Sequence, residues 1–314
     1  MMPDVRARVP FDGGGYLVRT NAAGFRSNRE FVKQRTPGTF RAILFGDSQT
    51  GADGVSNAAR YSDVLEHLVS NLEVFNYAIS GTGTDQQYLT YLESADVEHD
   101  LVIIAVYVAN IYRVASRFVP FAGAHGEELF YAKPYYAVEH DGLKLRHVPV
   151  PKAPLTAENI SPEDAGHVAR GVPYPRLRKV VQKVGMRDVV QKVVKFQPFP
   201  EYNSPRNPKW LLMRKILEMW ISRSSVPVLL VPLPMWPFIT GTNDPRGYQA
   251  RFRELADATG CHMHDPLPDL WRYSAEERLT FRFKVDPHFT AKGHQALAAS
   301  LAPTIERIVA AGRR

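Results

Sequence analysis

The stretch Thr39–Gly54 reads TFRAILFGDSQTGADG and decides the fold. Residues 41–46 form a short run of β-branched and aromatic side chains that ends at Gly46, and polar and small residues follow. This pattern predicts a buried strand, then a loop that leads into a helix near 58–70. Ser48 therefore comes directly after a buried strand, on a tight turn where a nucleophile can be held exposed. Taken alone, a serine in this position is more often an ordinary loop residue or a helix cap.

Outward from this stretch, strands and helices alternate. The run 101–109, LVIIAVYVA, has the continuous apolar character of a central parallel strand. Further strands are expected at 73–78, 225–234 and 261–265, and helices at 84–96, 208–223, 245–259 and from the Thr290 cap onward. On the helix at 84–96 the apolar face would hold Tyr88, Leu89, Leu92 and Ala95. This order predicts an α/β protein with a doubly wound, flavodoxin-like sheet of five parallel strands.

The middle of the chain does not follow this scheme. Twelve of the 24 prolines lie between Pro120 and Pro208. The segment 131–150 is typical of a hairpin with its turn at Asp141-Gly142, and 176–196 has the spacing of an amphipathic helix or helix pair. We expect an N-terminal extension over 1–40 that packs on the core, a core over 41–117 and 208–314, and an inserted cap over 118–207. The cap would cover the carboxyl edge of the sheet, where open α/β sheets bind ligands.

Composition excludes several classes of protein. The 314 residues are 45% hydrophobic and 23% charged, as in ordinary globular proteins. The single cysteine, Cys261, excludes an intrachain disulfide and any multi-cysteine metal site. The longest apolar runs are too short to span a membrane, and no secretory signal is visible at the N-terminus. We therefore expect a soluble, cytoplasmic protein of undetermined oligomeric state.

Positive charge is concentrated in one region. The net charge is +7, and the span Arg170–Arg223 contains 13 Lys or Arg against 3 Asp or Glu. No nucleic-acid reading module accompanies these cations, so a nucleic-acid partner is not expected. Three of them, Lys179, Lys183 and Arg187, lie outside the valine stripe of the expected helix. They either belong to a solvated lid helix or attract an anionic substrate or a membrane surface to the crevice.

Three other loops would reach the same edge of the sheet as Ser48. Asp286 and His288 precede the last helix, and side chains at i and i+2 of an extended segment point the same way, so Asp286 could orient the imidazole. Gly81, after the second strand, could offer a backbone N–H to an oxyanion, and Asn110, after the third, a side-chain amide. The alternatives are a turn with a surface histidine, a flexible glycine turn and a strand-terminating asparagine.

Together these residues resemble the four conserved blocks of the SGNH (GDSL-type) hydrolases. The match consists of Gly46-Asp47-Ser48, the small residues ending in Gly81, Asn110, and the Asp286/His288 pair before Lys292-Gly293-His294. The segment 19–27, RTNAAGFRS, is also similar to one that precedes the first block in many bacterial members. The resemblance covers about 20–116 and 224–309.

The resemblance implies Ser48 as nucleophile, His288 as general base and Asp286 as the acid that orients it. It also implies an oxyanion hole made of the Ser48 N–H, the Gly81 N–H and the Asn110 amide. Two departures stand out: the third block is Val108-Ala109-Asn110-Ile111 instead of Gly-x-Asn-Asp, and only Pro287 separates Asp286 from His288 where two residues are usual. A Ser–His pair supported by a backbone carbonyl is the alternative to a full triad.

The expected function is that of a serine esterase without a cofactor, acting on a small O-acyl ester, for example O-acetyl on a glycan or metabolite. The alternatives are an acyltransferase with the same triad, or a non-catalytic carbohydrate- or partner-binding module. His262 and His264 lack a third metal ligand, and 81–84 lacks the lysine of a phosphate loop, so no metal or nucleotide site is expected. We expect Asp47 to hold the Ser48 loop, and Trp210, Met213 and Trp220 to belong to the core.

Overall fold

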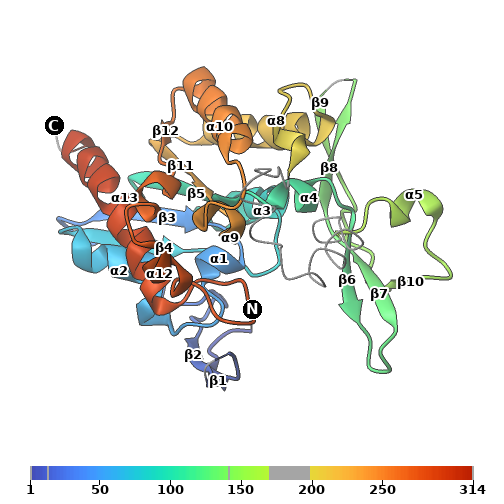
Figure 1. Cartoon of the computed structure of the whole chain (residues 1–314), viewed down its shortest axis with the longest axis horizontal. Coiled ribbons are helices and arrows are strands. Elements are labelled where there is room, and N and C mark those ends of the chain that lie inside the picture. Colours follow the sequence, from blue (N-terminus) through green and yellow to red (C-terminus); the bar gives the residue numbers. More distant parts are fainter. Residues whose placement is uncertain (1, 13, 141, 170–198, 313–314) are drawn as a thin grey trace.

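The computed structural model describes residues 2–12, 14–140, 142–169 and 199–312. Its centre is a parallel sheet of five strands in the order β12-β11-β5-β3-β4 (Figure 1). These strands are β3 (Phe40–Phe45), β4 (Leu72–Asn76), β5 (Leu101–Tyr107), β11 (Val228–Leu233) and β12 (His262–Met263). Numbered along the chain from β3, the spatial order is 2-1-3-4-5, which is the flavodoxin-like arrangement that the alternation predicts.

The continuous apolar run of β5 places it in the middle of the sheet. Its first six residues are buried, and it pairs in parallel with β3 on one side and with β11 on the other. In register, Leu101 faces Ala42 and Val102 faces Val228. A strand covered on both faces needs apolar side chains at every position, which explains why β5 shows no alternation.

Helices cover the two faces of the sheet (Figure 1). On one side α2 (Tyr61–Leu68) contacts α13 (Ala291–Gly312), and on the other α8 (Pro208–Arg223) contacts α3 (Thr84–Ser94), α4 (Asn110–Val114) and α10 (Arg246–Thr259). Short helices complete the connections: α1 (Ser48–Gly51), α5 (Pro162–Ala165), α9 (Trp236–Ile239), α11 (Leu267–Leu270), α12 (Ala275–Leu279) and the 3-10 turns Asn57–Ala59 and Pro200–Tyr202. Among the described residues, no helix combines the length and apolar character needed to span a membrane.

The predicted inner faces are right for α8 and partly wrong for α3. On α8, Trp210, Met213 and Trp220 are fully buried, as expected. On α3, Leu92 is exposed and Tyr91 is buried in its place. The reason is aromatic packing: the Tyr91 ring lies 5.6 Å from the rings of both Phe45 and Trp220, so the tyrosines form the inner face of this helix.

Two regions outside the central sheet contain strands of their own. An N-terminal hairpin of β1 (Arg6–Val9) and β2 (Tyr16–Arg19) was not predicted. In the middle of the chain, β6 (Phe118–Ala122), β7 (Glu128–Ala132) and β10 (Leu155–Thr156) form a small antiparallel sheet, also not predicted.

The hairpin expected at 131–150 is β8 (Tyr135–Glu139) paired with β9 (Gly142–Arg146). Residues 131–132 belong instead to β7, because Tyr131 and Ala132 pair with β6. Asp141 of the expected turn lies outside the described residues, and so does the whole expected helix at 176–196, with Lys179, Lys183 and Arg187.

Candidate active site

Ser48 is the first residue of α1, three residues after the end of β3. Asp47 caps this short helix: its Oδ1 accepts the Gln49 N–H at 3.0 Å, and its carbonyl oxygen accepts the N–H groups of Thr50 and Gly51. The Ser48 N–H belongs to the first turn, where a helix has no internal acceptor. Ser48 is only 7% exposed, so it is less accessible than the sequence led us to expect.

Glycine is required at position 46 by the tightness of this turn. A Cβ at Gly46 would lie 2.3 Å from Thr50 Oγ1 and 2.5 Å from Thr50 Cβ, both far inside van der Waals contact. The strand can therefore pass directly into α1 only because residue 46 has no side chain.

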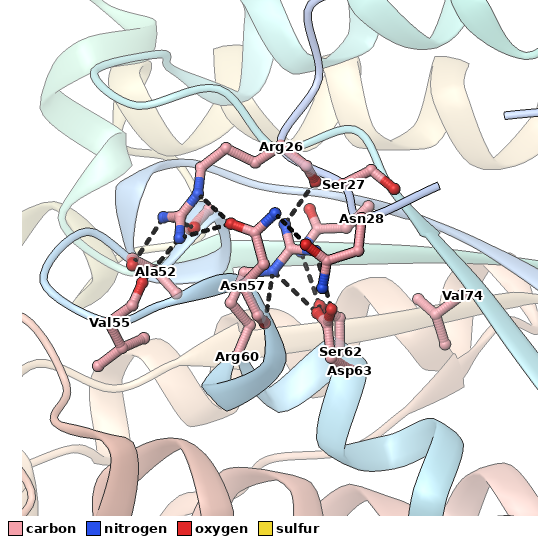
Figure 2. Close-up of polar contacts among 12 residues, drawn as sticks. Arg26, Ser27, Asn28, Ala52, Val55, Asn57, Arg60, Ser62, Asp63 and Val74 are labelled. Atoms are coloured by element: carbon pink, nitrogen blue, oxygen red, sulfur yellow. Dashed lines mark hydrogen bonds and ion pairs between the residues drawn. The ribbon is translucent and has the colours of Figure 1, made fainter. Parts of the chain in front are cut away.

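A buried arginine from the N-terminal segment holds the far end of α1 (Figure 2). The Arg26 guanidinium donates to the carbonyl oxygens of Gly51 (2.6 Å), Ala52 (2.9 Å) and Val55 (2.7 Å), and to Asn57 Oδ1. The C-terminal carbonyls of a helix have no internal donors and favour a cation. Burial lowers the pKa of Arg26 to about 10, which still leaves it charged at neutral pH.

Asp286 and His288 are in direct contact. Asp286 Oδ1 lies 2.5 Å from His288 Nδ1 and accepts the His288 backbone N–H at 2.9 Å. A single intervening residue, Pro287, is thus enough to bring the carboxylate onto the ring. His288 also lies close enough to Asp47 to lower its pKa, although burial and Arg113 have larger effects on that carboxyl. Phe283 of the same loop lies beside Gly54, which follows α1: a Cβ at Gly54 would lie 2.6 Å from the Phe283 ring.

The N-terminal hairpin region packs against the histidine loop. The Phe11 ring lies 5.1 Å from Phe283 and 6.4 Å from His288, and Asp12 Oδ2 accepts the Val285 N–H at 2.8 Å. These contacts join residues more than 270 positions apart, and no local pattern in the sequence indicated them.

Gly81 and Asn110 reach the site from the ends of β4 and β5. Gly81 has a φ of +82°, which L-residues with a side chain rarely adopt. No atom lies near the position of a Cβ, so glycine is favoured there by the backbone conformation and not by lack of space. Its loop is tied to the Ser48 loop by an Ile79 N–H···O Gly46 bond of 3.2 Å. Asn110 begins α4 and is fully buried, and its Nδ2 has no hydrogen-bond partner in the part of the chain that the structure describes.

Sequence reasoning missed Arg113, whose guanidinium contacts these loops. Its Nη1 donates to Asp47 Oδ2 at 2.8 Å, to Asn110 Oδ1 at 3.1 Å and to Thr82 O at 3.3 Å. The only local signal was its position one helical turn after Asn110. Burial raises the pKa of Asp47, while the charge of Arg113, the Gln49 N–H, the charge of His288 and the Asn110 side chain act in the opposite direction.

The structure thus brings Asp286 and His288 into contact and joins the loops of Ser48, Gly81 and Asn110. Within the described ranges, Ser48 Oγ makes no hydrogen bond to His288. His264, considered as a metal ligand, uses Nε2 toward Ser300 Oγ at 2.7 Å and Nδ1 toward Thr304 Oγ1 at 3.0 Å, so both nitrogens have partners within the fold.

No protein-family model matches the sequence, and no curated protein matches it. Several solved structures do. A member of the lipolytic G-D-S-L family from Veillonella parvula is 10% identical, with 86% of this chain and 100% of that chain covered and a TM-score of 0.47. A lipase/acylhydrolase from Enterococcus faecalis is 16% identical, with 86% and 96% covered and a TM-score of 0.44. A variant of an acetyl-xylooligosaccharide esterase from Geobacillus is 14% identical, with 85% and 94% covered and a TM-score of 0.44. The chain is similar in fold to these proteins.

Proposed function

We propose that this protein is a serine esterase of the SGNH type that hydrolyses a small O-acyl ester. The observation that carries the proposal is the Asp286–His288 contact of 2.5 Å, which forms in spite of the shortened Asp-x-His spacing. A carboxylate on Nδ1 leaves Nε2 as the acceptor nitrogen, which is the tautomer that a general base needs.

In the proposed reaction, Ser48 Oγ attacks the ester carbonyl carbon while His288 Nε2 takes the hydroxyl proton. The tetrahedral intermediate then collapses: the bond to the alcohol oxygen breaks, and His288 returns the proton to the leaving alcohol. A water molecule attacks the acyl-enzyme by the same steps, releasing the carboxylic acid and restoring Ser48. Asp286 keeps the ring oriented and stabilises the imidazolium that forms in each step.

The negative charge of the intermediate would be stabilised by three donors. These are the N–H of Ser48 in the first turn of α1, the N–H of Gly81 and the Nδ2 of Asn110. Asn110 Nδ2 supports this assignment because it is buried and makes no hydrogen bond within the described residues, and a buried donor without a hydrogen bond is costly unless a ligand supplies one; the nearby Asp47 carboxylate is its competing acceptor. Donors of this kind are each worth roughly 3–4 kcal/mol in acyl transfer.

We propose a short acyl group because the nucleophile is almost enclosed. The support is that Ser48 is only 7% exposed. A series of p-nitrophenyl esters from acetate to octanoate tests this point. The expected result is the highest kcat/KM for acetate, and a preference for octanoate would contradict it.

The activity itself is tested by labelling with a fluorophosphonate followed by intact-mass measurement. We expect one adduct on the wild-type protein and none on Ser48→Ala, with loss of p-nitrophenyl acetate hydrolysis by about 10⁴-fold or more. The melting temperature of Ser48→Ala should stay near that of the wild type. A Ser48→Ala protein that keeps its activity would end the proposal.

The basic residues Lys179, Lys183 and Arg187 are proposed to attract an anionic substrate toward this edge of the sheet. Attraction between exposed charges is screened over about 8–10 Å at physiological salt. Turnover of an anionic ester should therefore fall as salt rises from about 20 to about 300 mM, and that of a neutral ester should stay nearly constant. Substituting the three residues with Gln should flatten the salt dependence, and an unchanged slope would leave them with no part in substrate attraction.

A further inference from the structure

A single guanidinium joins the three loops that would build the oxyanion hole. Arg113 Nη1 contacts Asp47, the residue before Ser48; Thr82, the residue after Gly81; and the side chain of Asn110. Arg113 itself lies on α4, one turn after Asn110, and a third of its side chain is exposed. Ser48, Gly81 and Asn110 come from different strands, so a shared contact of this kind fixes their relative positions.

The chemistry of the guanidinium decides which way the Asn110 amide faces. A guanidinium has five N–H donors and no acceptor, so the amide must present Oδ1 to it. The Oδ1 to Nη1 distance of 3.1 Å agrees with that. Nδ2 is then directed away from Arg113; it makes no hydrogen bond in the described part of the chain, although the Asn110 side chain is close enough to the Asp47 carboxylate to lower its pKa. Turning the amide over would place two donors face to face.

We infer that Arg113 is a positioning residue that sets the Asn110 amide with Nδ2 available to the oxyanion. The inference rests on the proposed esterase function and deepens it. The residue that follows Asn110 is the apolar Ile111, and the contact to Asn110 Oδ1 comes from Arg113.

A purely structural role for Arg113 makes a different prediction. Asp47 is fully buried, and Arg113 is its ion-pair partner at 2.8 Å. If Arg113 only balanced this charge, its removal would destabilise the protein without acting through Asn110. A double-mutant cycle between Arg113 and Asn110 separates the two roles, because it measures whether one residue acts through the other.

The cycle uses Arg113→Met, Asn110→Ala and the double variant, with p-nitrophenyl acetate as substrate. Arg113→Met should lower kcat roughly 10–100-fold, less than the 10²–10³-fold expected when the donor itself is removed. In the Asn110→Ala background the same change should cost less than about threefold, because the amide that Arg113 orients is gone. KM should change little in all variants, since the donor acts mainly in the transition state.

Two further variants guard against misfolding. Arg117→Met is the matched control: it removes an arginine four residues later whose Nη1 pairs with Glu163 and Asp164, and it should leave kcat unchanged. If Arg113→Met does not fold, Asp47→Asn combined with Arg113→Met removes both charges and allows the same cycle. Arg113→Lys should restore part of the activity, since an ammonium is also a donor without an acceptor.

The outcomes are distinct. A kcat loss that disappears in the Asn110→Ala background supports the inference. Equal losses in both backgrounds, or a folded Arg113→Met with wild-type kcat, overturn it while leaving the esterase function in place. A wild-type protein that neither takes up the fluorophosphonate on Ser48 nor hydrolyses the ester overturns the proposed function, and the inference with it.

Discussion

Asp286 and His288 lie in a bend of the chain and not in the extended segment that the sequence suggested, because the Asp286 side chain closes a turn by accepting the N–H two residues on. The carboxylate reaches both the ring Nδ1 and the backbone N–H of His288, so it fixes the ring and the loop together. Shortening the spacing by one residue therefore does not by itself remove the orienting acid, because an Asp side chain at i reaches the ring at i+2.

Asp286→Asn tests whether this contact serves catalysis. If Asp286 orients His288, the wrong tautomer should lower kcat by about 10⁴-fold. If a backbone carbonyl orients the ring instead, the loss should be roughly tenfold or less. The wild type should lose activity on the acid side, where a general base cannot accept a proton, and a flat pH–rate profile would exclude His288 as the base.

At the scale of elements, two buried arginines donate hydrogen bonds to backbone carbonyls near opposite ends of β3. Arg26 binds the end of α1 and the loop after it, where its acceptors are the carbonyls of Gly51, Ala52 and Val55. Arg41 is also fully buried, but it lies at the start of β3 and donates to the carbonyls of Val32, Gln34 and Glu98 and to Glu73. Only Arg26 touches the segment that carries Ser48.

These two residues make a matched pair of variants. Arg26→Ala and Arg41→Ala should each cost about 3 kcal/mol or more in the free energy of unfolding, since each leaves several buried carbonyls without donors. Arg26→Ala should also lower kcat at least tenfold at a temperature where both proteins are folded. Equal kcat values for the two variants would show that Arg26 stabilises the fold without positioning Ser48.

Helix α13 carries a histidine that must stay neutral. His294 is fully buried with no partner for either ring nitrogen among the described residues, and it stacks on Tyr61 at 5.9 Å. Burial lowers its pKa to about 3, and the charges of Arg26, Arg60 and His288 add to this. In the unfolded chain the same ring binds a proton near pH 6.5.

Stability should therefore fall as the pH drops below that value, because the unfolded state takes up a proton that the folded state does not. From pH 7.5 to 5 the contribution of His294 is a loss of about 2 kcal/mol. Urea unfolding at both pH values measures it, with His294→Phe as the control that cannot titrate. If the variant and the wild type lose the same stability over this range, His294 is not the group responsible.

At the scale of the whole molecule, the middle segment is anchored to the central sheet region through a buried ion pair. Lys133, which follows β7, contacts Asp85 in the first turn of α3, and both side chains are almost completely buried. Burial raises the pKa of Asp85, and the charge of Lys133 opposes that shift. Nearby, Tyr136 of β8 packs 6.1 Å from Tyr88 of α3.

Replacing one member of this ion pair should lower the free energy of unfolding more than replacing both members. Lys133→Met leaves a buried carboxyl without its partner and should cost about 3–5 kcal/mol in unfolding free energy. Combining it with Asp85→Asn should recover most of that loss, as measured by urea unfolding of the three proteins. A double variant as unstable as Lys133→Met would show that the segment is held by packing around the pair and not by its charge balance.

The sequence by itself determined the central sheet and the local parts of the site. Apolar runs and helical spacing predict the five strands and their order, since burial on both faces leaves a continuous signature in β5. The Asp286–His288 contact was also predictable, because it depends on only two positions of chain. By contrast, the sequence did not show that Tyr91 and not Leu92 is buried on α3. Tyr91 is buried because its ring packs against Phe45 and Trp220, which come from other elements of the fold.

The long-range contacts were decided only by the tertiary structure. Arg26 reaches carbonyls 25 to 29 residues away, and Arg113 reaches Asp47 at a separation of 66. An arginine in a sequence carries no sign of its acceptors, since a backbone carbonyl is present at every position. Those partners exist because parallel strands end at one edge of the sheet and bring their loops together there, and that meeting is a property of the folded chain.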